Sequence, residues 1–300
     1  MDLRDARIAV TGATGFLGRY IVDVLLARGA HVVGVVRNPE RVPDLAARIE
    51  LRRADLADRA LLAAGFAGAD AVVSNAALFS LRNQRWEDHQ KANVRGTVNV
   101  FDALADAGVA RVAHVSSVAV YAAHGPLVGE DAPQLSASLR RTMFNTYSIS
   151  KAVSEQVAWR KAAEHGLALT TVRPCAIYGA FDPNFTAVVR RLLDLPLTIM
   201  PAWTRIPLIY AGDVAEAIAR ALERPAAVGR AYNVTGDDLT MWEFARAWRE
   251  AGGPAGFVLP LPFPFARRYD HTRARVELDW QNRPFVQALR DTFAREAAGR

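Results

Sequence analysis

A tyrosine and a lysine stand four residues apart in the stretch Tyr147-Ser148-Ile149-Ser150-Lys151. This spacing puts both side chains on one face of a helix. The chain has seven tyrosines but only Lys91, Lys151 and Lys161 as lysines, so random placement rarely produces such a pair. An ammonium beside a phenol favours the phenolate and lowers the phenol pKa, which predicts Tyr147 as a general acid or base.

A hydroxyl earlier in the chain completes the candidate chemistry. Ser117 lies just beyond residues 112–115, which we expect to form a strand. Its hydroxyl can hold a carbonyl or alcohol oxygen while Tyr147 moves the proton, and Lys151 can also reach a cofactor ribose. Hydride transfer needs these groups and a nicotinamide.

A glycine-rich turn predicts where that nicotinamide cofactor binds. An apolar strand, 6–10, precedes the turn, and helical spacing begins at Phe16 and stops at Gly29. Glycines permit a positive φ, a close approach to a pyrophosphate, and tight packing of helix on strand. The helix N-terminus then faces the phosphates. The predicted contacts are Gly12, Thr14, Gly15, Phe16, Leu17 and Gly18.

Arg37 follows the second predicted strand, 31–36, where the adenosine ribose lies in this architecture. A guanidinium there can pair with a 2′-phosphate, whereas an acidic residue would repel it. The sequence therefore favours NADP(H), with NAD(H) also possible. Other residues predicted at the cofactor follow later strands: Asp55, Leu56, Asn75, Ala76 and Ala77.

Strands and helices alternate through the first half of the chain. Further strands are expected at 49–52, 69–74 and 169–173, and helices at 86–107 and 147–165. This rhythm predicts an α/β fold, a doubly wound parallel sheet of the Rossmann type. Residues 1–179 form the expected dinucleotide-binding domain, with its sheet completed by segments around 205–235. Residues 180–300 form mainly a smaller, interleaved substrate domain.

The composition sets limits on partners and location. Lysine and arginine total 37 against 31 acidic residues, a net charge of +6 without basic blocks, which does not indicate nucleic-acid binding. Cys175 is the only cysteine, and the six histidines lack metal-ligand spacing, so no metal is expected. No apolar run is long enough for a membrane span and no apolar signal region opens the chain, so we expect a cytoplasmic location.

One segment, 251–266, has no charged residue, four prolines and three phenylalanines. We expect it to pack between domains. The alternatives are an apolar substrate wall or a patch that touches a membrane.

The chain resembles the extended short-chain dehydrogenase/reductase family, which includes NAD-dependent epimerases and dehydratases. The resemblance covers about residues 7–234 and rests on several motifs in family order. They are Thr11-Gly12-Ala13-Thr14-Gly15-Phe16-Leu17-Gly18, Asp55-Leu56, Asn93-Val94-Arg95-Gly96-Thr97, Val115-Ser116-Ser117-Val118-Ala119-Val120-Tyr121, Tyr147 with Lys151, Arg173-Pro174-Cys175-Ala176-Ile177-Tyr178-Gly179, and Asp213-Val214-Ala215.

The resemblance implies roles for individual residues. Ser117 would orient the substrate oxygen, Tyr147 would transfer the proton, and Lys151 would lower the tyrosine pKa. Asn93 matches an asparagine that supports a proton-relay water in related members, or it is structural here. The nicotinamide would pass Pro174, Ala176 and Ile177. The family also implies a homodimer in which the helices of Asn93 and Tyr147 form a four-helix bundle.

Departures from the family pattern narrow the reaction. Val118 and Ala119 replace the Asp-Glu pair typical of sugar-nucleotide dehydratases, which disfavours dehydration. Ile206 stands where epimerases often have an arginine that grips a diphosphate, with Arg205 beside it. Apolar side chains predicted to line the substrate pocket resemble the dihydroflavonol reductase and hydroxysteroid dehydrogenase branch: Phe79, Leu81, Phe181 and Trp203.

The sequence thus predicts an NADP-preferring oxidoreductase that interconverts a carbonyl and a secondary alcohol on a small, fairly apolar substrate. A nucleotide-sugar epimerase that recycles its NAD internally is the alternative. A non-catalytic nucleotide sensor is a third possibility, which the retained Ser117, Tyr147 and Lys151 disfavour.

Overall fold

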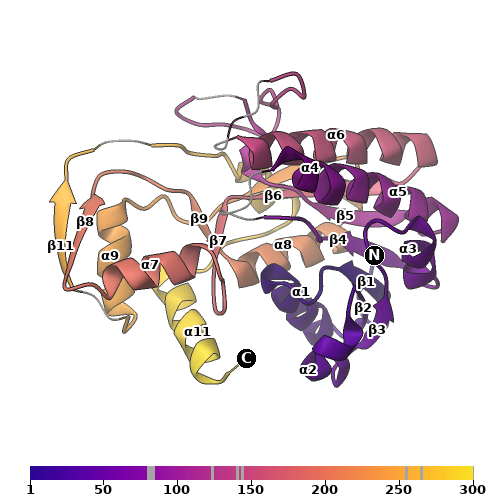
Figure 1. The fold of residues 1–300 in the computed structure, drawn as a ribbon, viewed down its shortest axis with the longest axis horizontal. Helices are drawn as coiled ribbons and strands as arrows, with labels where there is room; N and C mark the ends of the chain where they lie inside the picture. Colours follow the sequence, from indigo (N-terminus) through magenta and orange to yellow (C-terminus); the bar gives the residue numbers. More distant parts are fainter. Residues whose placement is uncertain are drawn as a thin grey trace.

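A parallel seven-stranded sheet organises the computed structural model (Figure 1), which describes residues 1–79, 85–122, 125–139, 142, 145–253, 256–263 and 266–299. The strand order is β10-β6-β5-β4-β1-β2-β3. This is the expected doubly wound Rossmann-type sheet, and its outer strand β10 comes from the second half of the chain. The bounds are β1 Arg7–Thr11, β2 His31–Val36, β3 Glu50–Arg53, β4 Ala71–Ser74, β5 Arg111–Val115, β6 Ala168–Pro174 and β10 Ala231–Val234.

Helices cover both faces of the sheet and enclose two apolar cores. On one face, α1 (Phe16–Ala27) packs against α8 (Ala211–Glu223); on the other, α5 (Gly96–Asp106) lies between α3 (Arg59–Phe66) and α6 (Thr146–His165). Strand residues alternate between the cores, so Ile8 and Val10 join the first while Ala9 joins the second. The predicted helix 86–107 is α4 (Trp86–His89), one π-helical stretch (Gln90–Arg95) and α5.

The second half of the chain adds two small parallel sheets and more helices. In one sheet β7 (Ala176–Tyr178) pairs with β9 (Leu208–Tyr210), and in the other β8 (Leu197–Pro201) pairs with β11 (Phe257–Leu261). The Thr240 and Glu243 side chains form a capping box that opens α9. The remaining helices are α2 (Pro43–Ala46), α7 (Phe185–Leu193), α9 (Met241–Glu250), α10 (Thr272–Glu277) and α11 (Phe285–Ala297).

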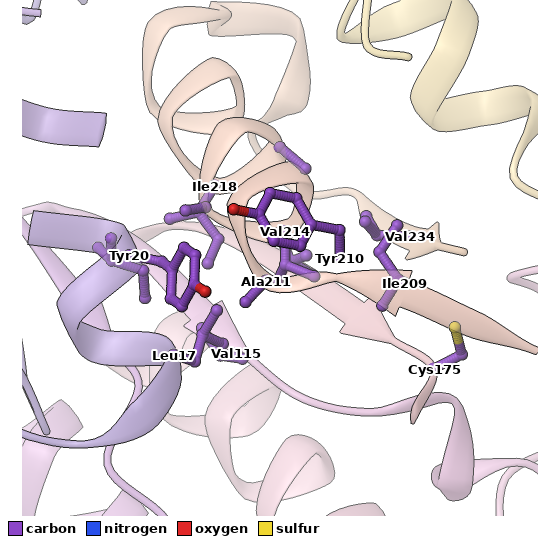
Figure 2. Close-up of a cluster of buried hydrophobic side chains, with 14 of the residues drawn as sticks. Leu17, Tyr20, Val115, Cys175, Ile209, Tyr210, Ala211, Val214, Ile218 and Val234 are labelled. Atoms are coloured by element: carbon purple, nitrogen blue, oxygen red, sulfur yellow. The ribbon is translucent and has the colours of Figure 1, made fainter. Parts of the chain in front are cut away.

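Tyr20 on α1 packs against the second half of the chain and accepts a hydrogen bond from it. Figure 2 shows its ring on α1 facing Tyr210 and the start of α8, and the two rings meet edge to face with centroids 5.5 Å apart. The Tyr20 hydroxyl accepts a hydrogen bond of 2.8 Å from the Ala180 amide. This buried junction fixes the segment after β7 relative to the glycine turn.

The uncharged segment 251–266 does not lie between domains in its described part, so that expectation is wrong. Val258 is buried, but Phe257, Leu259, Leu261 and Phe263 are exposed. Alternation along β11 turns one side chain inward and its neighbours outward. None of the helices in the described ranges is both long and apolar enough to cross a membrane.

Candidate active site

The glycine turn between β1 and α1 has the backbone that a dinucleotide cradle needs. Gly12 has a φ of +70°, and a Cβ atom there would stand 3.0 Å from the Ala76 backbone. A Cβ at Gly18 would lie 2.0 Å from the carbonyl oxygen of Gly12, so only glycine lets α1 start so close to the turn. The Thr11 hydroxyl accepts hydrogen bonds from the Asn75 and Ala76 amides, which ties the ends of β1 and β4 together.

One cavity of about 1300 Å³ runs along the carboxyl ends of the sheet strands. It is long enough to hold a dinucleotide with a substrate beside it. Among the predicted cofactor residues, Gly18 does not line this cavity, because it lies against the Gly12 carbonyl inside the turn. The predicted cofactor residues on the lining are Gly12, Thr14, Gly15, Phe16, Leu17, Arg37, Asp55, Leu56, Asn75, Ala76, Ala77, Tyr147, Lys151, Pro174, Ala176 and Ile177.

Lys151 is buried on α6 and aims at the end of β5. Its Nζ donates a hydrogen bond of 2.8 Å to the carbonyl oxygen of Val115. Desolvation lowers the pKa of its ammonium to about 8, and the negative charge of Glu155 one helical turn later opposes that fall. Burial therefore makes the charged form of Lys151 less stable than that of an exposed lysine.

Tyr147 and Ser117 meet inside the cavity. Hydrogen bonding with Ser117 lowers the pKa of the Tyr147 phenol, but the larger effect of desolvation raises that pKa to about 12. Lys151, whose ammonium donates to Val115 in this structure, is not among the causes of this shift. The protein alone thus does not lower the pKa of Tyr147, in contrast to the sequence expectation.

Asn93 uses its amide to hold structure around the site. Its Oδ1 accepts from the Leu78 amide at 2.6 Å, and its Nδ2 donates to the Leu78 carbonyl at 3.1 Å and to Ser150 Oγ at 3.0 Å. Ser150 in turn donates to the Tyr147 carbonyl. These bonds support a positioning role for Asn93, and a relay role stays a prediction.

Glu155, one helical turn after Lys151, forms a buried ion pair with Arg173 that the sequence analysis did not predict. Arg173 on β6 donates through Nε to both carboxylate oxygens of Glu155 at 3.0 Å, and its Nη1 donates to the Tyr121 hydroxyl at 2.7 Å. These bonds hold the pKa of Glu155 below its usual value despite burial. The available signal was the spacing of Glu155, four residues after Lys151.

The structure separates the predicted substrate residues. Phe79 lines the cavity, and its ring meets the Tyr147 ring edge to face with centroids 4.9 Å apart. Phe181 and Trp203 are exposed and lie outside this lining, so the structure does not bring them together with Phe79 and their substrate role stays a prediction. Leu81 falls outside the described residues. Sequence reasoning missed other lining residues: Leu135, Leu139, Phe185, Val188, Arg267 and Tyr269.

Arg37 stands exposed at the rim of the cavity, directly after β2. Arg53 on the neighbouring strand β3, in contrast, bonds Glu40 at 2.8 Å. A guanidinium placed beyond β2 suits a phosphate on the adenosine ribose.

A family model for NAD-dependent epimerases and dehydratases matches residues 8–235. The chain belongs to this family. A ketoreductase from Stigmatella aurantiaca that acts on 4-hydroxy-2-methyl-3-oxo-4-farnesyl-3,4-dihydroquinoline-1-oxide is 34% identical over 274 residues, 88% of this chain and 79% of that protein. Dihydroflavonol 4-reductase from Zea mays is 28% identical over 263 residues, 81% of this chain and 73% of the maize protein.

Solved structures agree on the fold. The crystal structure of UDP-glucuronic acid 4-epimerase from Bacillus cereus in complex with NAD superimposes with a TM-score of 0.79 over 96% of this chain and 97% of the other, at 19% identity. The family and its relatives make this chain an NAD(P)-dependent enzyme. They support the sequence-based resemblance.

The residues of the glycine turn fit a nicotinamide dinucleotide. Side chains at Gly12 and Gly18 would fill the turn, and the N-terminus of α1 offers unpaired amides for a pyrophosphate. When bound, such a cofactor supplies or accepts the hydride that no side chain can carry. The chain itself places the hydroxyls of Ser117 and Tyr147 on the lining of the same cavity.

Proposed function

We propose that the protein is an NADP-preferring reductase that interconverts a carbonyl and a secondary alcohol on a small, fairly apolar substrate. The observation that carries this proposal is the set of apolar side chains that line the cavity around the hydroxyls of Ser117 and Tyr147. Phe79 lies on the Tyr147 ring, and Leu135, Leu139, Phe185 and Val188 line the same cavity. An apolar substrate gains stability by covering these side chains.

The side chains divide the work in the direction of reduction. The Ser117 hydroxyl donates a hydrogen bond to the carbonyl oxygen and orients it. As that oxygen becomes an alkoxide, the Tyr147 phenol gives it a proton. A phenol pKa near 12 keeps this proton in place until the alkoxide, a stronger base, forms. The Lys151 ammonium stabilises the resulting phenolate once its charge develops.

Arg37 supports the choice of cofactor. Its exposed guanidinium on the cavity rim can form charge-assisted hydrogen bonds with a 2′-phosphate. Two relatives support the direction of the reaction: the Stigmatella aurantiaca protein is a ketoreductase and the maize protein a dihydroflavonol 4-reductase.

Arg267 favours a second candidate, a nucleotide-sugar epimerase. It lines the cavity beside Tyr269, on the side formed by the second half of the chain. A guanidinium there can pair with a diphosphate. It could replace the arginine that epimerases often have at the position of Ile206.

The test begins with the cofactor. Purified protein is denatured, the released nucleotide is identified, and NADPH oxidation is followed with apolar aldehydes and ketones and with nucleotide sugars. We expect an empty or exchangeable site, NADPH oxidation with a ketone, and formation of the matching alcohol. Tyr147→Phe protein prepared in parallel controls for contaminating reductases. Near-stoichiometric bound NAD, with sugars interconverted and no net oxidation of NADPH, would replace the reductase with the epimerase.

A further inference from the structure

The two-stranded sheet of β8 and β11 has an unusual outer surface. The strands pair in register, with Leu197 beside Phe257 and Ile199 beside Leu259. Thr198, Met200 and Val258 alternate with these residues and are buried beneath the sheet, where α7 and α9 pack against β8. Figure 1 shows this sheet at the end of the molecule opposite β2 and β3. Its outward side chains are therefore all apolar and uncovered.

We call this surface the apolar face. Ile199 keeps 58% of its surface exposed, Phe257 66% and Phe263 64%. Leu195 precedes β8 in the chain, Trp203 follows β8 and Phe263 follows β11. All three side chains are exposed and uncharged. The apolar face comprises Leu195, Leu197, Ile199, Pro201, Trp203, Phe257, Leu259, Leu261 and Phe263.

We propose that the apolar face binds the same face of a second copy of this chain around a twofold axis. The aromatic members, about half exposed, each present on the order of 100 Å². With nine members the face approaches the roughly 800 Å² per partner of a standard interface. A monomer rarely leaves such a contiguous area in water. A twofold axis needs only one self-complementary patch, and a face without charge can meet itself without repulsion.

The backbone favours another protein face over a lipid bilayer. Within the described ranges the sheet ends at β8 on one side and β11 on the other, so each strand has an edge without ladder partners. In hydrocarbon those amides and carbonyls would lack hydrogen bonds. Two sheets stacked face to face about 10 Å apart leave both edges in water. Pro201 and Pro260 also hinder addition of a strand at the edges.

This interface differs from the helix bundle that the family resemblance implies. Over Trp86–Asp106 and Thr146–His165, no large apolar side chain is among the exposed ones. More exposed large apolar side chains lie on and beside β8 and β11 than on these helices.

The test measures the oligomeric state of the full chain by sedimentation velocity from 1 to 100 µM. We expect a dimer for the wild type. Ile199→Lys places two like charges across the axis and should weaken dimerisation by at least about 100-fold. Val276→Lys is the matched control, because Val276 is 74% exposed on α10, away from the apolar face, and gains the same charge. This control should remain dimeric.

A second variant keeps the test decisive if Ile199→Lys folds poorly. Treatment with a short bismaleimide should crosslink Leu259→Cys protein into a covalent dimer and leave Val276→Cys protein uncrosslinked. The buried Cys175 should not react with the reagent. A monomeric wild type at 100 µM overturns the proposal, and so does an Ile199→Lys protein that dimerises like the wild type. Flotation of a monomeric wild type with phosphatidylcholine and phosphatidylglycerol vesicles would assign the apolar face to a membrane instead.

Discussion

The ammonium nitrogen of Lys151 donates a hydrogen bond of 2.8 Å to the carbonyl oxygen of Val115. Val115 ends β5 and Ser117 follows it, whereas Tyr147 stands one helical turn before Lys151 on α6. The bond therefore fixes the start of α6 against the strand end that carries the serine. The contact between the Ser117 and Tyr147 hydroxyls depends on this alignment.

The charge of Lys151 predicts an alkaline limit to activity. Its pKa lies near 8 because burial disfavours the ammonium, so the protonated fraction falls as the pH rises through that value. If the ammonium stabilises the developing phenolate, kcat/KM for carbonyl reduction should fall above about pH 8. The measurement is a pH profile of kcat/KM from pH 6 to 10. Lys151→Arg, whose guanidinium stays charged, should move the fall above pH 10; an unmoved profile would assign the limit to another group.

Removal of the Tyr147 hydroxyl separates chemistry from binding. Tyr147→Phe keeps the ring that packs on Phe79 but removes the proton. We expect kcat to fall by about 10²–10⁴-fold, the usual contribution of a general acid. The dissociation constant of NADPH, measured by fluorescence titration, should change less than about threefold, within the scatter of a neutral change. Full activity in this variant would contradict the assigned mechanism.

Arg37 should discriminate between the two nicotinamide cofactors. Arg37→Ala removes a charge-assisted hydrogen bond worth about 1.5–3 kcal/mol, so the dissociation constant of NADPH should rise about 10–100-fold. That of NADH should stay nearly unchanged, because it lacks the 2′-phosphate. Arg275→Ala, an exposed arginine on α10, removes the same charge elsewhere and is the control. Equal losses for both cofactors would remove the basis for an NADP preference.

The sequence predicts the nucleotide-binding half well because its signals are local. The β-branched run after Gly29 predicts a strand at 31–36, and this range matches β2 residue for residue. Gly12 and Gly18 predict the turn, since one adopts a positive φ and the other admits the Gly12 carbonyl at van der Waals distance. The Thr240-x-x-Glu243 spacing likewise predicts the capping box that opens α9.

Side chains outside these local patterns are harder to place. Phe181 and Trp203 are apolar and follow sheet strands in the chain, but nothing in their neighbourhood tells a cavity wall from an exposed surface. Phe181 has a φ of +63° and does not line the main cavity. The inward direction of Lys151, toward Val115, depends on how α6 docks on β5, and sequence spacing alone cannot supply that geometry.

The buried pair of Glu155 and Arg173 predicts a large loss of stability on neutralisation. Both side chains are almost completely buried, so Glu155→Gln leaves the Arg173 guanidinium without a counter-charge. We expect the free energy of unfolding, measured with urea, to fall by about 3–5 kcal/mol. Glu164→Gln on the same helix is the control: Glu164 is half exposed and pairs with Lys161, so its loss should change stability by about 0–1 kcal/mol. Equal effects in the two variants would show that the buried pair contributes no more than a surface pair.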